Sequence, residues 1–163
     1  MKALLVLAAL ALTGCGLRPL YAEGASGTVA TVLRSVQVAP IDGQVGWLVR
    51  NELVERLAGE RNGTSSYRLE VELDDDITGF GIRGDRAVTR ERRTLRARYR
   101  LVETATGTTV LDATAGSDAG IDVVSSEYAT IAAEQTAVER LSEVVAEQIV
   151  ARLGLFASRT GAR

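Results

Sequence analysis

Hydrophobic and polar residues follow two different periods along this chain, and each period predicts a different kind of element. In residues 67–73 every second residue is apolar, and in residues 94–102 apolar residues alternate with polar ones, mostly arginine. Such alternation is typical of strands with one buried face. In residues 44–58 and 126–154 apolar residues recur every three or four positions, which predicts two amphipathic helices.

Weaker patterns predict the elements between these segments. Residues 29–39 are rich in β-branched side chains and end at Pro40, which predicts a first strand closed by a proline. Residues 105–108 form a turn, and residues 109–115 predict the last strand. Residues 116–124 are loose and polar with some strand propensity.

The last helix has recognisable ends. Ser125 or Ser126 can cap its start, and Gly154 is expected to end it, which leaves residues 155–163 as a flexible tail. Trp47, in the earlier helix, is expected to pack between helix and sheet. The inward face of the last helix is predicted to contain Tyr128, Ile131, Val138, Leu141, Val145, Ile149 and Leu153.

Together these elements predict one domain over residues 29–154 with an α+β fold. In the order β-α-β-β-β-α, a mainly antiparallel four-stranded sheet would have two helices packed on one face. Antiparallel pairing of the second and third strands would place Glu70 and Glu72 near a row of arginines. The other face of the sheet would be polar and rich in arginine.

Composition removes several kinds of chemistry. The chain has 163 residues, one cysteine and no histidine, so disulfides, Cys-His pairs and a histidine base are excluded. With 19 basic and 21 acidic residues, there is no positive excess of the kind that drives binding to nucleic acid. Residues 74–76 are three aspartates that could attract calcium, but they lack the glycine and distal glutamate of an EF-hand loop. A solvated strand end is favoured, and neither a metal nor a cofactor is predicted.

The N-terminus predicts export and lipid attachment. Met1 and Lys2 precede an apolar run, residues 3–12, that is too short to span a bilayer. The following Leu-Thr-Gly-Cys at residues 12–15 resembles the bacterial lipobox, in which the cysteine sulfur receives a diacylglyceryl group. Residues 1–14 are therefore expected to be a lipoprotein signal peptide and residues 15–28 a tether acylated at Cys15, with acyl chains such as palmitate. The alternative is an ordinary signal peptide followed by a buried cysteine.

The candidate contact surface is a segment rich in glycine and arginine, residues 79–93. Arginine suits bidentate contacts with phosphate or carboxylate, and the glycines suggest a loop with apolar tips and basic flanks. An anionic, acyl-bearing partner or a protein wall would fit such a loop, whereas the arginines at 96, 98 and 100 are better explained as a solvated sheet face, because the alternation already accounts for them. The candidate residues are Phe80, Ile82, Arg83, Arg86, Arg90, Arg92 and Arg93.

Several stretches resemble one known family in the same order. A resemblance to the mature start of the alphaproteobacterial lipopolysaccharide-assembly lipoproteins, the LptE family, lies in Cys15-Gly16-Leu17-Arg18-Pro19-Leu20-Tyr21. Further similarity lies in Ala87-Val88-Thr89-Arg90, Ala97-Arg98-Tyr99-Arg100-Leu101, Ser126-Glu127-Tyr128-Ala129 and Ala132-Ala133-Glu134.

The resemblance implies a function and a location. It implies an outer-membrane lipoprotein of a Gram-negative cell that faces the periplasm and the interior of the β-barrel translocon LptD. There it would plug the barrel, assist barrel assembly and contact lipopolysaccharide during transport to the cell surface. Gly16 after the cysteine agrees with outer-membrane sorting.

Two other classes of function remain as alternatives. A periplasmic auxiliary lipoprotein of an ABC-type lipid transporter would keep the anchor but not the barrel partner. A carboxylate-dependent hydrolase would need paired acids in a cleft, whereas the carboxylates here fall on the solvent faces of predicted elements. We therefore expect a protein that is not an enzyme.

Overall fold

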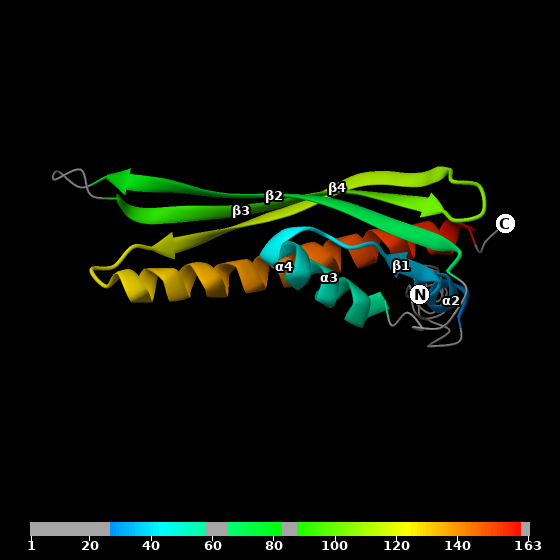
Figure 1. The fold of residues 1–163 in the computed structure, drawn as a ribbon, viewed down its shortest axis with the longest axis horizontal. Helices are drawn as coiled ribbons and strands as arrows, with labels where there is room; N and C mark the ends of the chain where they lie inside the picture. The colour runs from blue at the N-terminus through cyan, green and yellow to red at the C-terminus, as the bar shows by residue number, and fades with distance from the viewer. Residues whose placement is uncertain (1–26, 58–64, 83–87, 161–163) are drawn as a thin grey trace, which may run out of the picture.

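The computed structural model of the chain describes residues 27–57, 65–82 and 88–160. Helices and strands follow one another in an elongated arrangement, with the longest helix running along the sheet (Figure 1). The elements are α2 (Thr28–Arg34), β1 (Val36–Val38), α3 (Gly43–Leu57), β2 (Tyr67–Ile82), β3 (Val88–Glu103), β4 (Thr109–Asp122) and α4 (Glu127–Thr160).

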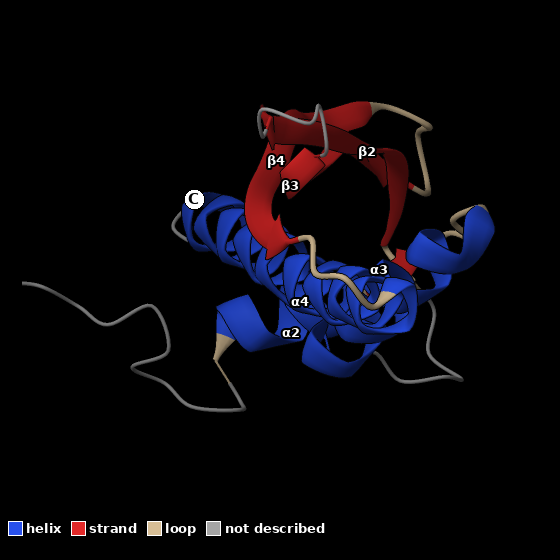
Figure 2. Ribbon diagram, turned by 90° about the vertical axis from the view of Figure 1, so that its left-hand side faces the viewer, coloured by secondary structure: helices blue, strands red, loops and turns tan. Residues whose placement is uncertain are grey.

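The four strands form one sheet in the order β1-β2-β3-β4. β2, β3 and β4 pair antiparallel, whereas the short β1 pairs in parallel with the start of β2. The sheet arches over α4, and the three described helices lie on that side of it (Figure 2). The predicted α+β class is confirmed, with one parallel strand pair and one additional short helix.

The core lies between the inner face of the sheet and the helices. Alternate residues of the strands point inward, as the period of two predicts. Leu69, Leu95 and Leu101 from the sheet meet Leu53 of α3 and Ile149 of α4, and all five have no exposed surface. Each such side chain stabilises the fold by about 1.5–3 kcal/mol through removal from water. The predicted strands and the central part of α4 therefore bury the faces expected.

The pairing of β2 with β3 agrees with the expected proximity of acids and arginines. Glu70 lies opposite Arg100 and Glu72 lies opposite Arg98 on the outer face. The guanidinium of Arg100 is 3.2 Å from the carboxylate of Glu72 and 3.7 Å from that of Glu70. The outer face of the sheet is therefore polar and rich in arginine, as predicted.

The prediction of a strand over residues 29–39 is wrong in its first half. Thr28–Arg34 form α2, and only Val36–Val38 form a strand. The last residue of the predicted tether, Thr28, is thus already helical. Preferences of β-branched residues are weak and yield to packing, and here Leu33 of α2 is 6% exposed as part of the core.

The end of the last helix also differs from the prediction. α4 continues through Gly154 to Thr160, so residues 155–160 are helix rather than a flexible tail. Gly154 and Ala157 are both buried, which shows that the glycine lies at a packing contact and does not end the helix. The predicted cap is confirmed at Ser126, whose Oγ accepts a hydrogen bond from Ala129 N at 3.4 Å.

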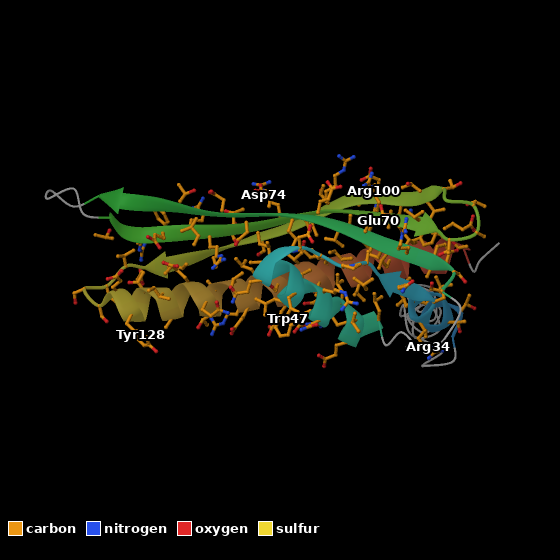
Figure 3. The ribbon with its side chains drawn as sticks, viewed as in Figure 1. Arg34, Trp47, Glu70, Asp74, Arg100 and Tyr128 are labelled. Atoms are coloured by element: carbon orange, nitrogen blue, oxygen red, sulfur yellow. The ribbon has the colours of Figure 1, made fainter. Side chains whose placement is uncertain are left out.

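Three large side chains expected in the interior are exposed. Tyr128 is 84% exposed and Ile131 is 56% exposed, because the first turns of α4 extend beyond α3 (Figures 1 and 3). Trp47 on α3 is 62% exposed and does not pack between helix and sheet. The rest of the predicted inward face of α4, from Val138 to Leu153, is buried.

The polar segment after residue 115 is a strand and not a loose connection. β4 runs to Asp122, which lies opposite Arg90 of β3. None of the described helices is both long and apolar enough to cross a bilayer. The predicted signal peptide and Cys15 lie outside the described residues.

Candidate functional site

The segment predicted as a loop, residues 79–93, is mostly a β-hairpin. β2 continues to Ile82 and β3 begins at Val88, so only residues 83–87 lie between the two strands. Gly81 has a φ of +77°, and a Cβ there would lie 2.8 Å from Thr89 Oγ1, which donates a hydrogen bond to Gly81 O. The glycine therefore serves a tight approach between the strands and not a hinge.

Two candidate arginines and the candidate phenylalanine share the outer face of this hairpin. The guanidinium carbon of Arg92 lies 5.4 Å from the ring centroid of Phe80, within the range of a cation–π contact. Arg92 Nε is 3.7 Å from Asp118 Oδ2, and Arg90 Nε donates to Asp122 Oδ1 at 3.0 Å. Both acids come from β4, so the face combines an apolar ring with arginines that already have counter-charges.

Arg93 points the other way, toward α4. Its Nε and Nη2 donate to the two carboxylate oxygens of Asp75 at 2.8 and 2.6 Å, and its Nη1 donates to Glu134 O of α4 at 3.0 Å. The side chains of Arg93 and Asp75 are 12% and 23% exposed. The hydrogen bonding of Arg93 to the carboxylate of Asp75, which accepts, is the main reason that the pKa of Arg93 is raised. Arg93 is thus a structural link between β2, β3 and α4, and its guanidinium is occupied within the fold.

The outer-face arginines continue along β3 toward the other end of the sheet. Arg98 binds Asp112 through two hydrogen bonds of 3.3 and 3.0 Å, which raise the pKa of Arg98 and hold that of Asp112 below its usual value. Arg96 has no ion pair among the residues that the structure describes, although Asp74 lies opposite it in the register. A shallow hollow of about 640 Å³ lies here, lined by Arg96, Arg98, Glu72, Asp74, Asp118 and Gln148 among others.

Each arginine in the described part of the hairpin has an acidic partner. Arg90 faces Asp122, Arg92 faces Asp118, and Arg93 binds Asp75. The sequence reasoning weighed acids close in the chain and on the preceding strand, so it missed the partners from β4. Any local positive excess therefore comes from residues 83–87, where two arginines, Arg83 and Arg86, accompany one acid, Asp85. Those residues, and the side chain of Ile82, lie outside what the structure describes.

Sequence reasoning also missed an apolar surface at the same end of the molecule. The β2–β3 hairpin and the start of α4 lie at one end, opposite α2 (Figure 1). Val124, Tyr128 and Ile131 are each at least half exposed there, and Tyr128 points away from the sheet (Figure 3). The apolar period continues through the start of α4, so the sequence predicts a helix that is buried along its whole length. Nothing in the sequence shows where α3 stops covering α4, and the exposed surface was therefore not predicted.

The arrangement is suited to binding an anion. Exposed ion pairs contribute at most about 1 kcal/mol each, so an incoming anion can replace a carboxylate partner of Arg90 or Arg92 at small cost. Within residues 27–57, 65–82 and 88–160, no group of three or more histidine, cysteine or acidic residues could hold a metal ion. The three aspartates at 74–76 lie inside β2, and the middle one is bound by Arg93.

One comparison with known proteins identifies a family. A sequence model of the family LptE, described as lipopolysaccharide-assembly, matches residues 33–153. No curated protein is similar enough in sequence to count as a match.

Solved structures of low sequence identity share the fold. A Caulobacter crescentus CB15 protein described as a lipoprotein superposes with a TM-score of 0.67 at 22% identity, covering 81% of this chain and 98% of its own. A minor lipoprotein from Acinetobacter baumannii gives 0.58 at 12% identity, covering 75% and 92%. Rare lipoprotein B from Shewanella oneidensis gives 0.55 at 8% identity, covering 78% and 96%.

Proposed function

Because the chain belongs to the LptE family of lipopolysaccharide-assembly proteins, we propose that it is a lipid-anchored, non-enzymatic subunit at the outer membrane. In this role it plugs the LptD β-barrel, assists barrel assembly and contacts lipopolysaccharide on its way to the cell surface. The observation that carries the proposal is the family match over residues 33–153, which includes the whole sheet and most of α4.

The outer face of the sheet supports a place inside a barrel. The lumen of a large outer-membrane barrel is polar, and the outer face of β3 carries arginines in ion pairs that are largely exposed, such as Arg90–Asp122 and Arg98–Asp112. Such pairs can exchange partners with charged groups of a polar wall without leaving a buried charge unpaired. An apolar outer face would instead require a different surrounding.

The proposed anchor is Cys15, the last residue of the lipobox-like sequence. Two or more acyl chains hold a protein firmly at a membrane, since each buried CH2 contributes about 0.8 kcal/mol. Cys15→Ala should abolish labelling by radioactive palmitate and leave the signal peptide uncleaved, whereas Cys15→Ser tests whether the thiol itself is needed. Palmitate labelling that persists in both variants would show that the anchor is elsewhere or absent.

The proposed contact with lipopolysaccharide lies at the hairpin end. Its candidate residues remain Phe80, Ile82, Arg83, Arg86, Arg90 and Arg92, and Arg93 is proposed to act there only by holding the hairpin onto α4. The exposed side chains Val124, Tyr128 and Ile131 add apolar surface for acyl chains or for the barrel. Positive charge from Arg83 and Arg86 would meet phosphate groups, since the described arginines already balance their acids.

A charge-matched pair of variants tests this contact. Arg83→Gln, Arg86→Gln and Arg90→Gln together should weaken lipopolysaccharide binding at least about tenfold, because three exposed contacts of about 0.5–1 kcal/mol each are lost. The control replaces Arg96, Arg98 and Arg100 with Gln, which removes the same charge from a part of β3 farther from residues 83–87. The binding constants are measured for both variants at low and physiological salt, because screening should reduce the difference.

Barrel association measured on the same two variants separates the two possible contacts. Loss of lipopolysaccharide affinity in the hairpin variant alone supports lipid contact. Unchanged lipopolysaccharide affinity with reduced barrel co-purification would show that the hairpin is a docking surface for the barrel and that the lipid contact is wrong. Equal losses in both variants would show a general charge effect and would also contradict a specific hairpin site.

A further inference from the structure

One edge of the sheet has main-chain groups that no described strand uses. β1 pairs only with the first residues of β2, as Val36–Val38 lie beside Tyr67–Leu69, and the last contact is Ala39 N donating to Leu69 O at 2.9 Å. β2 nevertheless continues for more than a dozen residues, to Ile82. Among the described residues, no strand pairs with β2 on this side beyond Leu69.

The register shows which peptide groups face this open side. Tyr67 N donates to Ser35 O on the β1 side, whereas Thr104 N donates to Ser66 O on the β3 side. In an antiparallel ladder the N–H and C=O of successive residues point alternately to the two sides. The odd-numbered residues from Leu73 to Gly79 therefore present their N–H and C=O groups to the open edge. Every residue from Asp74 to Gly81 is exposed.

The opposite edge of the sheet is blocked by a side chain at its middle, whereas no such block is seen on the edge of β2 among the described residues. At the middle of β4, Gly116 N donates to Gln148 Oε1 at 3.1 Å, and Gln148 Nε2 donates to Gly116 O at 3.3 Å. A side chain of α4 thus occupies the edge-facing groups of one residue of β4, Gly116. Unprotected edges readily accept another strand, and proteins commonly cover or block them.

The charges along the open edge determine what kind of strand fits it. Glu70 and Glu72 are near Arg100, and Asp75 binds Arg93 on the inner side. Asp74 and Asp76, on the outer side, have no ion pair among the described residues. An added strand would place its own outward side chains beside these two acids, where basic residues are favourable and acidic ones are not.

We propose that the edge of β2 from Leu73 to Gly79 binds an extended segment of a partner protein that carries basic residues at alternate positions. Main-chain hydrogen bonds would supply affinity, and Asp74 and Asp76 would select the charge pattern. A second copy of this chain is disfavoured, because antiparallel pairing of two β2 edges around Asp75 would oppose acids with acids. The proposal does not depend on whether the barrel is the partner of the outer face.

A peptide with the sequence of residues 94–103, Thr-Leu-Arg-Ala-Arg-Tyr-Arg-Leu-Val-Glu, is a suitable probe. It has arginines at alternate positions, and in the fold the same sequence pairs with β2 on its other side. The control peptide has glutamate in place of its three arginines. The full chain in detergent micelles should bind the arginine peptide at least about tenfold more tightly than the control peptide. The glutamates of the control peptide would lie beside the acids of β2, and like charges on neighbouring strands are destabilising.

Amide hydrogen exchange distinguishes strand addition from simple charge attraction. Binding of the arginine peptide should slow exchange at Leu73, Asp75 and Ile77, whose N–H groups face the edge, and leave Asp74 and Asp76, which already face β3, unchanged. Binding without this alternating protection would overturn the proposal, and so would the absence of binding. Concentration-dependent self-association with the same protection pattern would overturn the choice of a basic partner.

A matched pair of variants gives an independent readout. Ile77→Pro removes one edge-facing N–H without removing a bond to β3, and proline is tolerated on edge strands in this position. Ile77→Val keeps the N–H. The peptide should bind the proline variant at least about tenfold more weakly than the valine variant. The proline variant loses the main-chain hydrogen bond of residue 77 to the peptide and, with it, the adjacent main-chain hydrogen bonds. Equal binding by the two variants would contradict strand addition, and if the proline variant does not fold, the exchange pattern of the unaltered chain decides.

Discussion

Arg92 and Arg93 are neighbours in the chain but have different roles, because successive strand residues point to opposite faces. Arg92 lies on the outer face over Phe80 and beside Asp118, with more than half of its side chain exposed. Arg93 lies on the inner face and is bound by Asp75 and by the carbonyl of Glu134. The alternation of residues 94–102 was visible in the sequence, and its extension back to residue 92 would have separated these two arginines.

The first prediction uses this difference. Arg93→Ala should lower the free energy of unfolding by about 2–3 kcal/mol, because it leaves the carboxylate of Asp75, whose side chain is only 23% exposed, without its charged donor. Arg92→Ala should change it by less than about 1 kcal/mol, since its ion pair is exposed. Urea unfolding of both variants measures the two values. Similar losses for Arg92→Ala and Arg93→Ala would contradict the assigned roles.

A double-mutant cycle with Asp75→Ala locates the energy in the ion pair itself. The coupling between Arg93 and Asp75 should be at least about 1 kcal/mol, as for residues in direct, partly buried contact. Additive effects would mean that Arg93 stabilises the protein mainly through Glu134.

At the scale of elements, periodicity was a reliable guide where it was strong. Residues 67–73, 94–102 and 44–58 show clear periods, and β2, β3 and α3 contain nearly all of them. Residues 28–34 form a helix despite their β-branched side chains, since packing of Leu33 in the core outweighs a weak local preference.

The length of the strands was harder to predict than their existence. The second halves of β2 and β4 have few apolar residues, because helices cover them only in part, and they are strands through main-chain pairing with β3. Main-chain pairing leaves no hydrophobic period in the sequence. The candidate site was affected most, since a segment predicted as a loop around Gly79 and Gly81 proved to be a paired hairpin whose counter-charges come from distant strands.

The second prediction concerns α4, whose start and middle differ in burial. Leu141→Asp should destabilise the protein by several kcal/mol, because Leu141 is 3% exposed and an aspartate there would be an unpaired charge in the core. Ile131→Asp makes the same kind of change where the side chain is 56% exposed, and the thermal melt should be nearly unaltered. A large loss of stability in Ile131→Asp would show that the start of α4 is covered in solution.

At the scale of the whole molecule, the proposed function assigns different contacts to the two ends. The described chain begins at α2, at the end opposite the β2–β3 hairpin and the start of α4 (Figure 1). α4 has 34 residues and is therefore about 51 Å long at 1.5 Å per residue. A lipid on Cys15 would lie twelve residues before Gly27, within about 40 Å of α2 if that segment were fully extended. Anchor and hairpin would then contact a membrane and a partner at separate places.

The measurement that tests the central claim most directly is purification of the intact, lipidated chain from outer membranes in mild detergent, followed by identification of the proteins that accompany it. The account predicts that one large β-barrel protein co-purifies with the chain. Purification of the chain alone, or together with components of an ABC-type lipid transporter, would contradict the proposal that it is a barrel-bound subunit of lipopolysaccharide assembly.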